Sequence, residues 1–406
     1  MEFKKHVLSN GIKLIHVQVA SPVAHCGFFI NTGSRDELEK EHGIAHFIEH
    51  LFFKGTKNRK SFHILSRLED VGGELNAYTT KEETCVHASF LKEHYSRAME
   101  LISDIIFNSI FPDKAIESER DVILDEINSY KDSPSEFIFD DYEDYFFSNH
   151  GLGRSILGTS KLLKKIKRED ISSFIARTYN TDQMVFASVG NMSMNKMVYW
   201  FEKYFSHIPS NHRTFERREF NSYKPFNLTL NKKTFQVHSI MGNLGYNFND
   251  TRRMGLHLLT NIIAGPGMIS RLNLALRERN GYSYNIESSY SPYSDVGLFT
   301  VYFSTDKVSL EKCFDIINKE FELLRTKPLG TIQLKKAKQQ ILGQLAISYE
   351  SNENQMLSIG KSYLVYDRVD TIDEIVAKIE SVTSSELMDI ANDVLNKNFL
   401  STLIYK

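Results

Sequence analysis

Hydrophobic and polar residues recur along the chain with spacings that predict both strands and helices. Two stretches of mixed polar and apolar residues, 5–9 and 12–19, flank an Asn10-Gly11 pair, which is typical of a β-hairpin turn. Helical spacing dominates residues 93–147. Between these regions the pattern predicts a strand at 24–33, a helix at 61–71, and a glycine turn followed by two strands at 72–91.

The two halves of the chain end in the same way. A helical pattern at 169–180 precedes a strand pattern at 184–191, and a helical pattern at 384–396 precedes a strand pattern at 399–406. We therefore expect an α+β fold with two similar domains, each a mostly antiparallel sheet flanked by helices. The polar, aperiodic stretch between them predicts a linker, with these limits: N-terminal domain 1–208, linker 209–225, C-terminal domain 226–406.

The segment GIAHFIEHLFFKGT (43–56) carries polar residues in an apolar setting. As a helix it is apolar nearly all round, so we expect it to be buried. His46 and His50 are four residues apart and project from one face, and Glu49 lies beside them. Buried imidazole and carboxylate groups are costly unless something pairs with them. A surface helix could carry this pattern harmlessly, but the apolar flanks leave no obvious solvated face.

The pattern H-x-x-E-H is the inverted form of the zinc-protease motif. Neutral imidazoles suit Zn²⁺, and a catalytic zinc site needs a third protein ligand and an open position for water. A nearby carboxylate then takes the proton of the attacking water. The predicted helix 115–132 offers Glu119 and Glu126, seven residues apart and nearly on one face. Their spacing does not decide which of them meets the metal, and acids on a charged helix are usually solvated.

Composition excludes several other classes of protein. The 406-residue chain has a net charge of −2, which gives no electrostatic reason to expect nucleic-acid binding. Its three cysteines form no C-x-x-C pair, which argues against a disulfide framework or a cysteine-based zinc site. No run of about 18 apolar residues and no signal peptide is present, so we expect no membrane span and a cytoplasmic location.

Several segments in order resemble the pitrilysin/insulinase family of zinc metallopeptidases, in particular its two-domain type typified by the mitochondrial processing peptidase. The matching segments span the chain: GIAHFIEHLFFKGT (43–56), VGGELNAYTTKEET (71–84), ESERDVILDEI (117–127), GLGRSILGT (151–159) and AGPGMISRLNLALRERNGYSY (264–284). Such a set of ordered motifs is far more specific than H-x-x-E-H alone.

The resemblance implies a role for each of these residues. His46, His50 and Glu126 would ligate one Zn²⁺ per chain, Glu49 would be the general base, and Glu119 would support the ligands from a second layer. Asn76 and Ala77 would lie on an edge strand to which a substrate peptide adds as a further strand. Arg277 and Tyr284 match the family's substrate-contacting Arg/Tyr pair in the second domain.

This chain carries both the zinc motif and the Arg/Tyr pair, which heterodimeric relatives divide between two subunits. The resemblance therefore implies a homodimer whose closed chamber takes the zinc site and the Arg/Tyr pair from different chains. The expected function is hydrolysis of unstructured peptides by a zinc endopeptidase, with zinc-bound water activated by Glu49. The alternatives are a catalytically silent assembly subunit of the same fold and a maturation protease dedicated to one peptide. The loop AGPGMISR (264–271) is shorter than the glycine-rich loop of the processing peptidase's non-catalytic subunit.

Overall fold

The computed structural model describes residues 3–406. The chain forms two compact units, and each unit takes one segment from the far half of the sequence. Unit 1 comprises residues up to Asn128, Arg154–Arg217 and Ile347–Val369; unit 2 comprises Ser129–Gly153, Arg218–Ala346 and Asp370–Lys406. Residues 206–226 form neither a helix nor a strand. The domain limits expected from the sequence stay a prediction.

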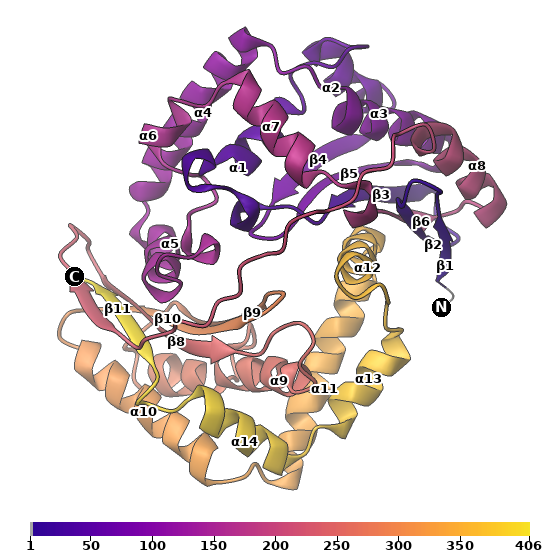
Figure 1. The fold of residues 1–406 in the computed structure, drawn as a ribbon. Coiled ribbons are helices and arrows are strands. Elements are labelled where there is room, and N and C mark those ends of the chain that lie inside the picture. The colour runs from indigo at the N-terminus through magenta and orange to yellow at the C-terminus, as the bar shows by residue number, and fades with distance from the viewer. Residues whose placement is uncertain (1–2) are drawn as a thin grey trace. The chain divides into compact units, whose positions relative to one another are not determined.

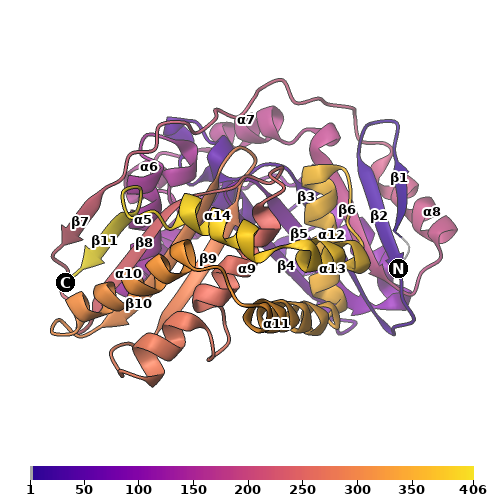
Figure 2. The same cartoon turned by 90° about the horizontal axis from the view of Figure 1, so that it is seen from below.

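Unit 1 is built on a six-stranded sheet with the strand order β1-β2-β6-β3-β5-β4 (Figure 1). Only β2 and β6 run parallel, and β4 is an edge strand; seen from below, β1 and β2 lie beside β6 (Figure 2). The strands are β1 Lys4–Val7, β2 Lys13–Gln18, β3 Val23–Ile30, β4 Glu74–Thr79, β5 Thr84–Leu91 and β6 Met184–Gly190.

The predicted N-terminal hairpin is confirmed. β1 pairs antiparallel with β2, with Val7 opposite Lys13. Gly11 has a φ of +96°, a conformation that residues with a Cβ rarely adopt, which explains the glycine at this turn.

One face of the unit 1 sheet carries the main core. Helices α1, α3 and α8 contribute Phe47, Ile102 and Phe201, which are fully buried with Phe28 and Phe186 of the sheet. The helices of this part of the chain are α1 Ile44–Leu51, α2 Ser61–Glu69, α3 Tyr95–Asn108, α4 Asp113–Lys131, α6 Ser160–Leu163, α7 Arg168–Thr178 and α8 Met194–Phe205.

The opposite face of this sheet is covered by α12 (Asn352–Tyr366), which comes from the far half of the sequence. Met356, Ile359 and Tyr363 pack there against strand residues that include Phe29. Burying each such side chain contributes about 1.5–3 kcal/mol. The contact is close: a Cβ on Gly360 would lie 2.2 Å from the Phe29 ring.

Unit 2 repeats this arrangement with the strand order β7-β11-β8-β10-β9, in which only β7 and β11 are parallel. From β2 to β4, unit 1 has the same order with the same single parallel pair, so the predicted α+β fold with two similar domains is confirmed. The strands are β7 Asn227–Leu230, β8 Val237–Gly245, β9 Ile286–Pro292, β10 Gly297–Thr305 and β11 Ser401–Tyr405.

The core of unit 2 is also two-sided. Helices α9, α10 and α14 bury Leu259, Ile317 and Ile390 against one face of the sheet, while α5 buries Tyr142 on the other. The helices are α5 Pro134–Phe146, α9 Arg253–Ala264, α10 Leu310–Thr326, α11 Thr331–Tyr349, α13 Ile372–Ser381, α14 Ser384–Val394 and a π-helical segment Asn273–Glu278. Among residues 3–406, no helix combines the length and the apolar character needed to cross a bilayer.

The close approach of α12 to β3 generates a stability prediction. Gly360→Ala places a methyl group 2.2 Å from the edge of the Phe29 ring, and such overpacking costs about 1–3 kcal/mol. Gly343 in α11 is the matched control, because a Cβ there meets nothing within 4 Å. We expect urea unfolding to show a loss of stability for Gly360→Ala and no loss, or a gain of up to about 1 kcal/mol, for Gly343→Ala. Equal stability of the two variants would contradict this packing of α12.

Candidate metal centre

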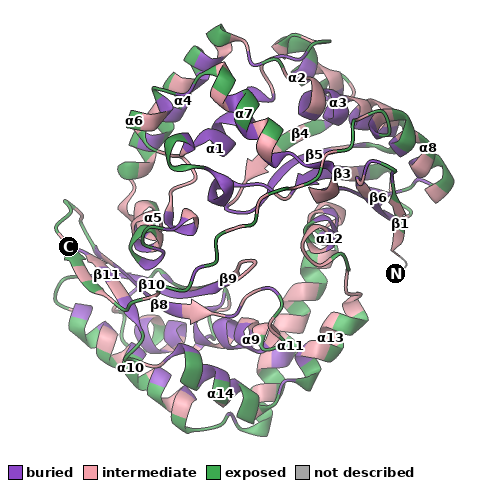
Figure 3. Cartoon of the chain, viewed as in Figure 1, coloured by how far each residue is buried: buried purple, intermediate pink, exposed green. Residues whose placement is uncertain are grey.

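Helix α1 places His46 and His50 on one face, one turn apart, in a buried setting. Its apolar residues Ile44, Phe47, Ile48 and Leu51 are fully buried, and the helix is buried along most of its length (Figure 3). His46 is itself only 8% exposed. The two imidazole rings lie 4.7 Å apart between centroids. The burial expected from the sequence is therefore present, and both imidazoles need polar partners.

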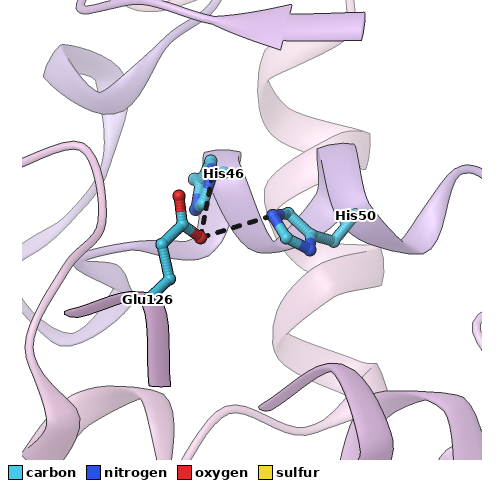
Figure 4. A group of neighbouring side chains, drawn as sticks. All are labelled: His46, His50 and Glu126. Atoms are coloured by element: carbon cyan, nitrogen blue, oxygen red, sulfur yellow. Dashed lines mark ion pairs between the residues drawn. The ribbon is translucent and has the colours of Figure 1, made fainter. Parts of the chain in front are cut away.

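Those partners come from α4. Its isoleucines Ile116, Ile123 and Ile127 face the core, and this fixes the rotation of the helix. Glu119 and Glu126, two helical turns apart, face α1. Glu119 is buried, whereas the side chain of Glu126 is 44% exposed. Glu126 points at both imidazoles from one side (Figure 4).

The distances fit a shared metal ion better than direct hydrogen bonds. Glu126 Oε2 lies 3.9 Å from His46 Nε2 and 3.7 Å from His50 Nε2, beyond hydrogen-bond range. Two ligand atoms on a tetrahedral zinc ion stand about 3.3 Å apart, given zinc–nitrogen distances of about 2.0–2.1 Å. One ligand atom from each of the three residues lies within 4.8 Å of the others, so small side-chain movements would bring all three onto one ion.

The second glutamate orients His50. Glu119 Oε2 lies 3.3 Å from His50 Nδ1, and Glu119 Oε1 lies 2.7 Å from Lys54 Nζ. Because an ionised carboxylate only accepts hydrogen bonds, Nδ1 of His50 carries the proton and donates it. The lone pair of His50 is then on Nε2, the atom that faces Glu126. This is the usual carboxylate–histidine arrangement around a metal ligand.

His46 is held in its neutral form. Burial, and secondarily the neighbouring His50, lower the pKa of His46 to about 4. Its Nδ1 is buried without a hydrogen-bond partner among the described residues. At neutral pH the ring therefore has a lone pair available for a metal without first losing a proton.

Glu49 directly precedes His50 in α1 and lies beside the His46/His50/Glu126 group. Burial raises the pKa of Glu49, while the hydroxyl of Thr79 and the charge of His50 oppose the rise. Its Oε2 is buried without a hydrogen-bond partner in residues 3–406. A carboxylate with a free oxygen and a raised pKa is suited to accept a proton from a water molecule near the His/His/Glu group.

Thr79 and Lys54 were not identified from the sequence. Thr79 ends strand β4 next to Glu49, and Lys54 lies three residues beyond the end of α1 and pairs with Glu119. The spacing of Lys54 could have drawn attention to it. Nothing in the sequence marks Thr79, because its proximity to α1 depends on how β4 pairs in the sheet.

Asn76 and Ala77 lie on β4, which packs against α1 and pairs with β5 only, in the described residues. Asn76 is opposite His87 and Ala77 opposite Val86. The remaining edge of β4 has no neighbouring strand in the sheet. This is the edge position that the sequence resemblance implied for them.

Arg277 and Tyr284 are brought together in unit 2. Both line a cavity of about 540 Å³ between the π-helical segment and β9. Tyr284 is 69% exposed, and Arg277 Nε lies 3.6 Å from Glu278 Oε1. Neither side chain is committed to the hydrophobic core of unit 2.

The sequence matches two known family models. Residues 15–160 match the model described as insulinase (peptidase family M16), and residues 165–341 match the model described as the peptidase M16 inactive domain.

Curated relatives match over nearly their whole length. An uncharacterized zinc protease of Bacillus subtilis is 31% identical, covering 99% of this chain and 98% of its own. An uncharacterized zinc protease of Rickettsia felis is 33% identical, and the match covers 98% of this chain and 96% of the relative. The mitochondrial-processing peptidase subunit beta of Saccharomyces cerevisiae is 30% identical, covering 95% and 87%.

Two solved structures share the fold. A protease from Helicobacter pylori superposes with a TM-score of 0.91 at 19% identity, covering 100% of this chain and 99% of its own. A protein from Pseudomonas fluorescens described as a peptidase M16 inactive domain superposes with a TM-score of 0.93 at 17% identity, covering 100% and 98%.

Proposed function

Because the chain belongs to the insulinase family, peptidase family M16, we propose that it is a zinc-dependent endopeptidase that hydrolyses unstructured peptides within a closed chamber. The observation that carries the proposal is the convergence of His46, His50 and Glu126 on one point, with Glu49 beside them. Relatives are named zinc proteases, which supports the metal and the reaction at the level of the family.

His46 and His50 supply two imidazole ligands and Glu126 a carboxylate, a donor set that suits zinc. When bound at such a site, Zn²⁺ polarises a peptide carbonyl and lowers the pKa of water. Glu119 keeps His50 in the tautomer that presents Nε2, and Lys54 in turn holds Glu119. His50 is therefore oriented before any metal binds.

Glu49 takes the proton of the attacking water through its free Oε2 and then passes it to the nitrogen of the leaving peptide. Its raised pKa makes it a better proton acceptor than a solvated glutamate.

The substrate would bind to the open edge of β4 as an additional strand. Backbone groups around Asn76 and Ala77 would then pair with the peptide in register, which gives affinity largely independent of its sequence. Only a peptide that is extended can do this, so folded proteins are excluded. In unit 2, Arg277 and Tyr284 offer a guanidinium and a phenol to the substrate backbone from their shared cavity.

The assembly that we propose is a homodimer in which one chain supplies the metal centre and its partner supplies the Arg/Tyr pair. We expect light scattering to give twice the 46.9 kDa mass of the chain. A monomer that cleaves peptides at the full rate would contradict it. The cytoplasmic location stays a prediction.

An assembly subunit without activity is the alternative from a different class. The presence of two imidazoles, the Glu126 carboxylate and Glu49 in one group argues against it, because a silent subunit has no use for a proton acceptor beside a metal site. A maturation protease dedicated to one peptide would share the whole mechanism. A panel of unrelated peptides separates it from a general peptidase.

The geometry assigns different weights to the two glutamates of α4. Glu119→Gln should lower the affinity for Zn²⁺ about 10- to 100-fold, because Glu119 orients His50. Glu126→Gln removes a ligand, so we expect it to lower the affinity further. Glu117→Gln, at an exposed position of the same helix, is the control and should bind like the wild type. Competition with a chromogenic chelator measures all three affinities. A stronger effect of Glu119→Gln than of Glu126→Gln would reverse the assignment.

Replacement of the proton acceptor tests the reaction itself. Glu49→Gln keeps the side chain's size and leaves the three ligands intact, so we expect one Zn²⁺ per chain and a loss of turnover of at least about 100-fold. Hydrolysis of a quenched fluorescent peptide by wild type and variant measures the difference. Full activity of Glu49→Gln would contradict the mechanism, and inactivity of both proteins on a varied peptide set would favour the assembly subunit.

A further inference from the structure

Helix α1 begins without a capping side chain of its own. Its first position follows Gly43, which has a φ of +96° and no side chain to accept a hydrogen bond. The first N–H groups of a helix have no partner within the helix. Gly43, Ala45 and the residues around them are buried or half-buried, so water cannot satisfy these groups.

Glu37 fills this role from six residues upstream. Its Oε2 accepts the N–H of Gly43 and its Oε1 accepts the N–H of Ala45, both at 3.0 Å. Glu37 is only 5% exposed. Each carboxylate oxygen thus satisfies one amide at the positive end of the helix, where a negative charge is favourable. Burial raises the pKa of Glu37, while the bonds from Ala45 and Gly43 and the charge of Arg154 oppose the rise and favour the ionised carboxylate.

The motif GLGRSILGT, which the metal centre does not use, packs around the same point. Arg154 donates from its guanidinium to the backbone carbonyl of Glu37 at 2.8 Å. His42 Nε2 lies 2.8 Å from the carbonyl oxygen of Ser155. A Cβ on Gly158 would lie 2.6 Å from the Cα of Gly43, so the two glycines allow direct backbone contact.

We propose that Glu37 is a positioning residue: with Arg154 and the Gly43–Gly158 contact, it fixes the start of α1 and thereby the placement of His46, Glu49 and His50. An isolated helix of eight residues has little stability of its own, so its position depends on such anchors. Ala45 immediately precedes His46, so a shift of the first turn moves the ligand directly. The link to catalysis rests on the proposed metallopeptidase function; the anchoring of α1 does not.

Glu37→Gln is the test, because the glutamine amide keeps one acceptor and opposes the other backbone N–H with an NH₂ group. We expect hydrogen exchange of the backbone amides at the start of α1 to accelerate at least about tenfold, and Zn²⁺ affinity to fall about 10- to 100-fold. With substrate, kcat should fall while KM stays within about twofold, because Glu37 does not line the β4 edge.

Glu41→Gln is the matched control. Glu41 is a buried acid of the same loop, but it accepts from the N–H of Leu38 and pairs with Arg177 rather than with α1. We expect wild-type exchange in α1 and wild-type Zn²⁺ affinity for this variant. A comparable effect of Glu41→Gln would show that the loop as a whole, and not the Glu37 contacts, holds the helix.

A folded Glu37→Gln protein with α1 exchange and Zn²⁺ affinity within twofold of wild type would overturn the proposal. If this variant does not fold, Arg154→Gln replaces it, and a smaller effect in the same direction is expected; wild-type exchange in that variant would also overturn the proposal. Exchange requires neither metal nor substrate. It therefore still decides the role of Glu37 if the wild-type protein neither binds Zn²⁺ nor cleaves peptides.

Discussion

The burial of α1 is the constraint on which the candidate site depends. An eight-residue helix packed into the core of unit 1 buries His46 and leaves Glu49 and His50 only partly exposed, so these groups need partners from other elements. Glu119 accepts from His50, Thr79 lies beside Glu49, and the Nε2 atoms of both imidazoles face Glu126. Burial also keeps His46 neutral. The same burial that makes its unpaired polar atoms unfavourable therefore leaves the ring with a lone pair for a metal cation.

The sheet positions these partners through long-range pairing. Strand β4 is both the neighbour of α1 and the open edge of its sheet, so one strand supports Glu49 and offers its backbone to a peptide. Helix α4 brings its two glutamates to α1 because its isoleucines are fixed in the core. The packing of β4 and α4 in unit 1 thus also positions the side chains of the candidate metal centre.

Much of this could be predicted from sequence, because local patterns carry it. The Asn10-Gly11 turn, the alternating strands and the spacing of His46 and His50 each depend on neighbouring residues, and membership of the insulinase family confirms the resemblance drawn from the ordered motifs. No local pattern in residues 352–366 indicates that α12 covers the sheet of unit 1. The contact of Lys54 with Glu119 and the capping by Glu37 likewise require the tertiary structure, because no local pattern distinguishes these side chains from solvated ones.

X-ray absorption at the zinc edge of the metal-loaded protein is the most direct test of the His46/His50/Glu126 centre, because it reports the ligands without requiring a substrate. We expect nitrogen and oxygen ligands only, at about 2.0–2.1 Å, with the outer-shell scattering of two imidazoles. That scattering should drop to one imidazole in a His46→Ala protein that still binds the ion. Sulfur ligands at about 2.3 Å, or a spectrum without imidazole scattering, would contradict a metal centre built from His46, His50 and Glu126.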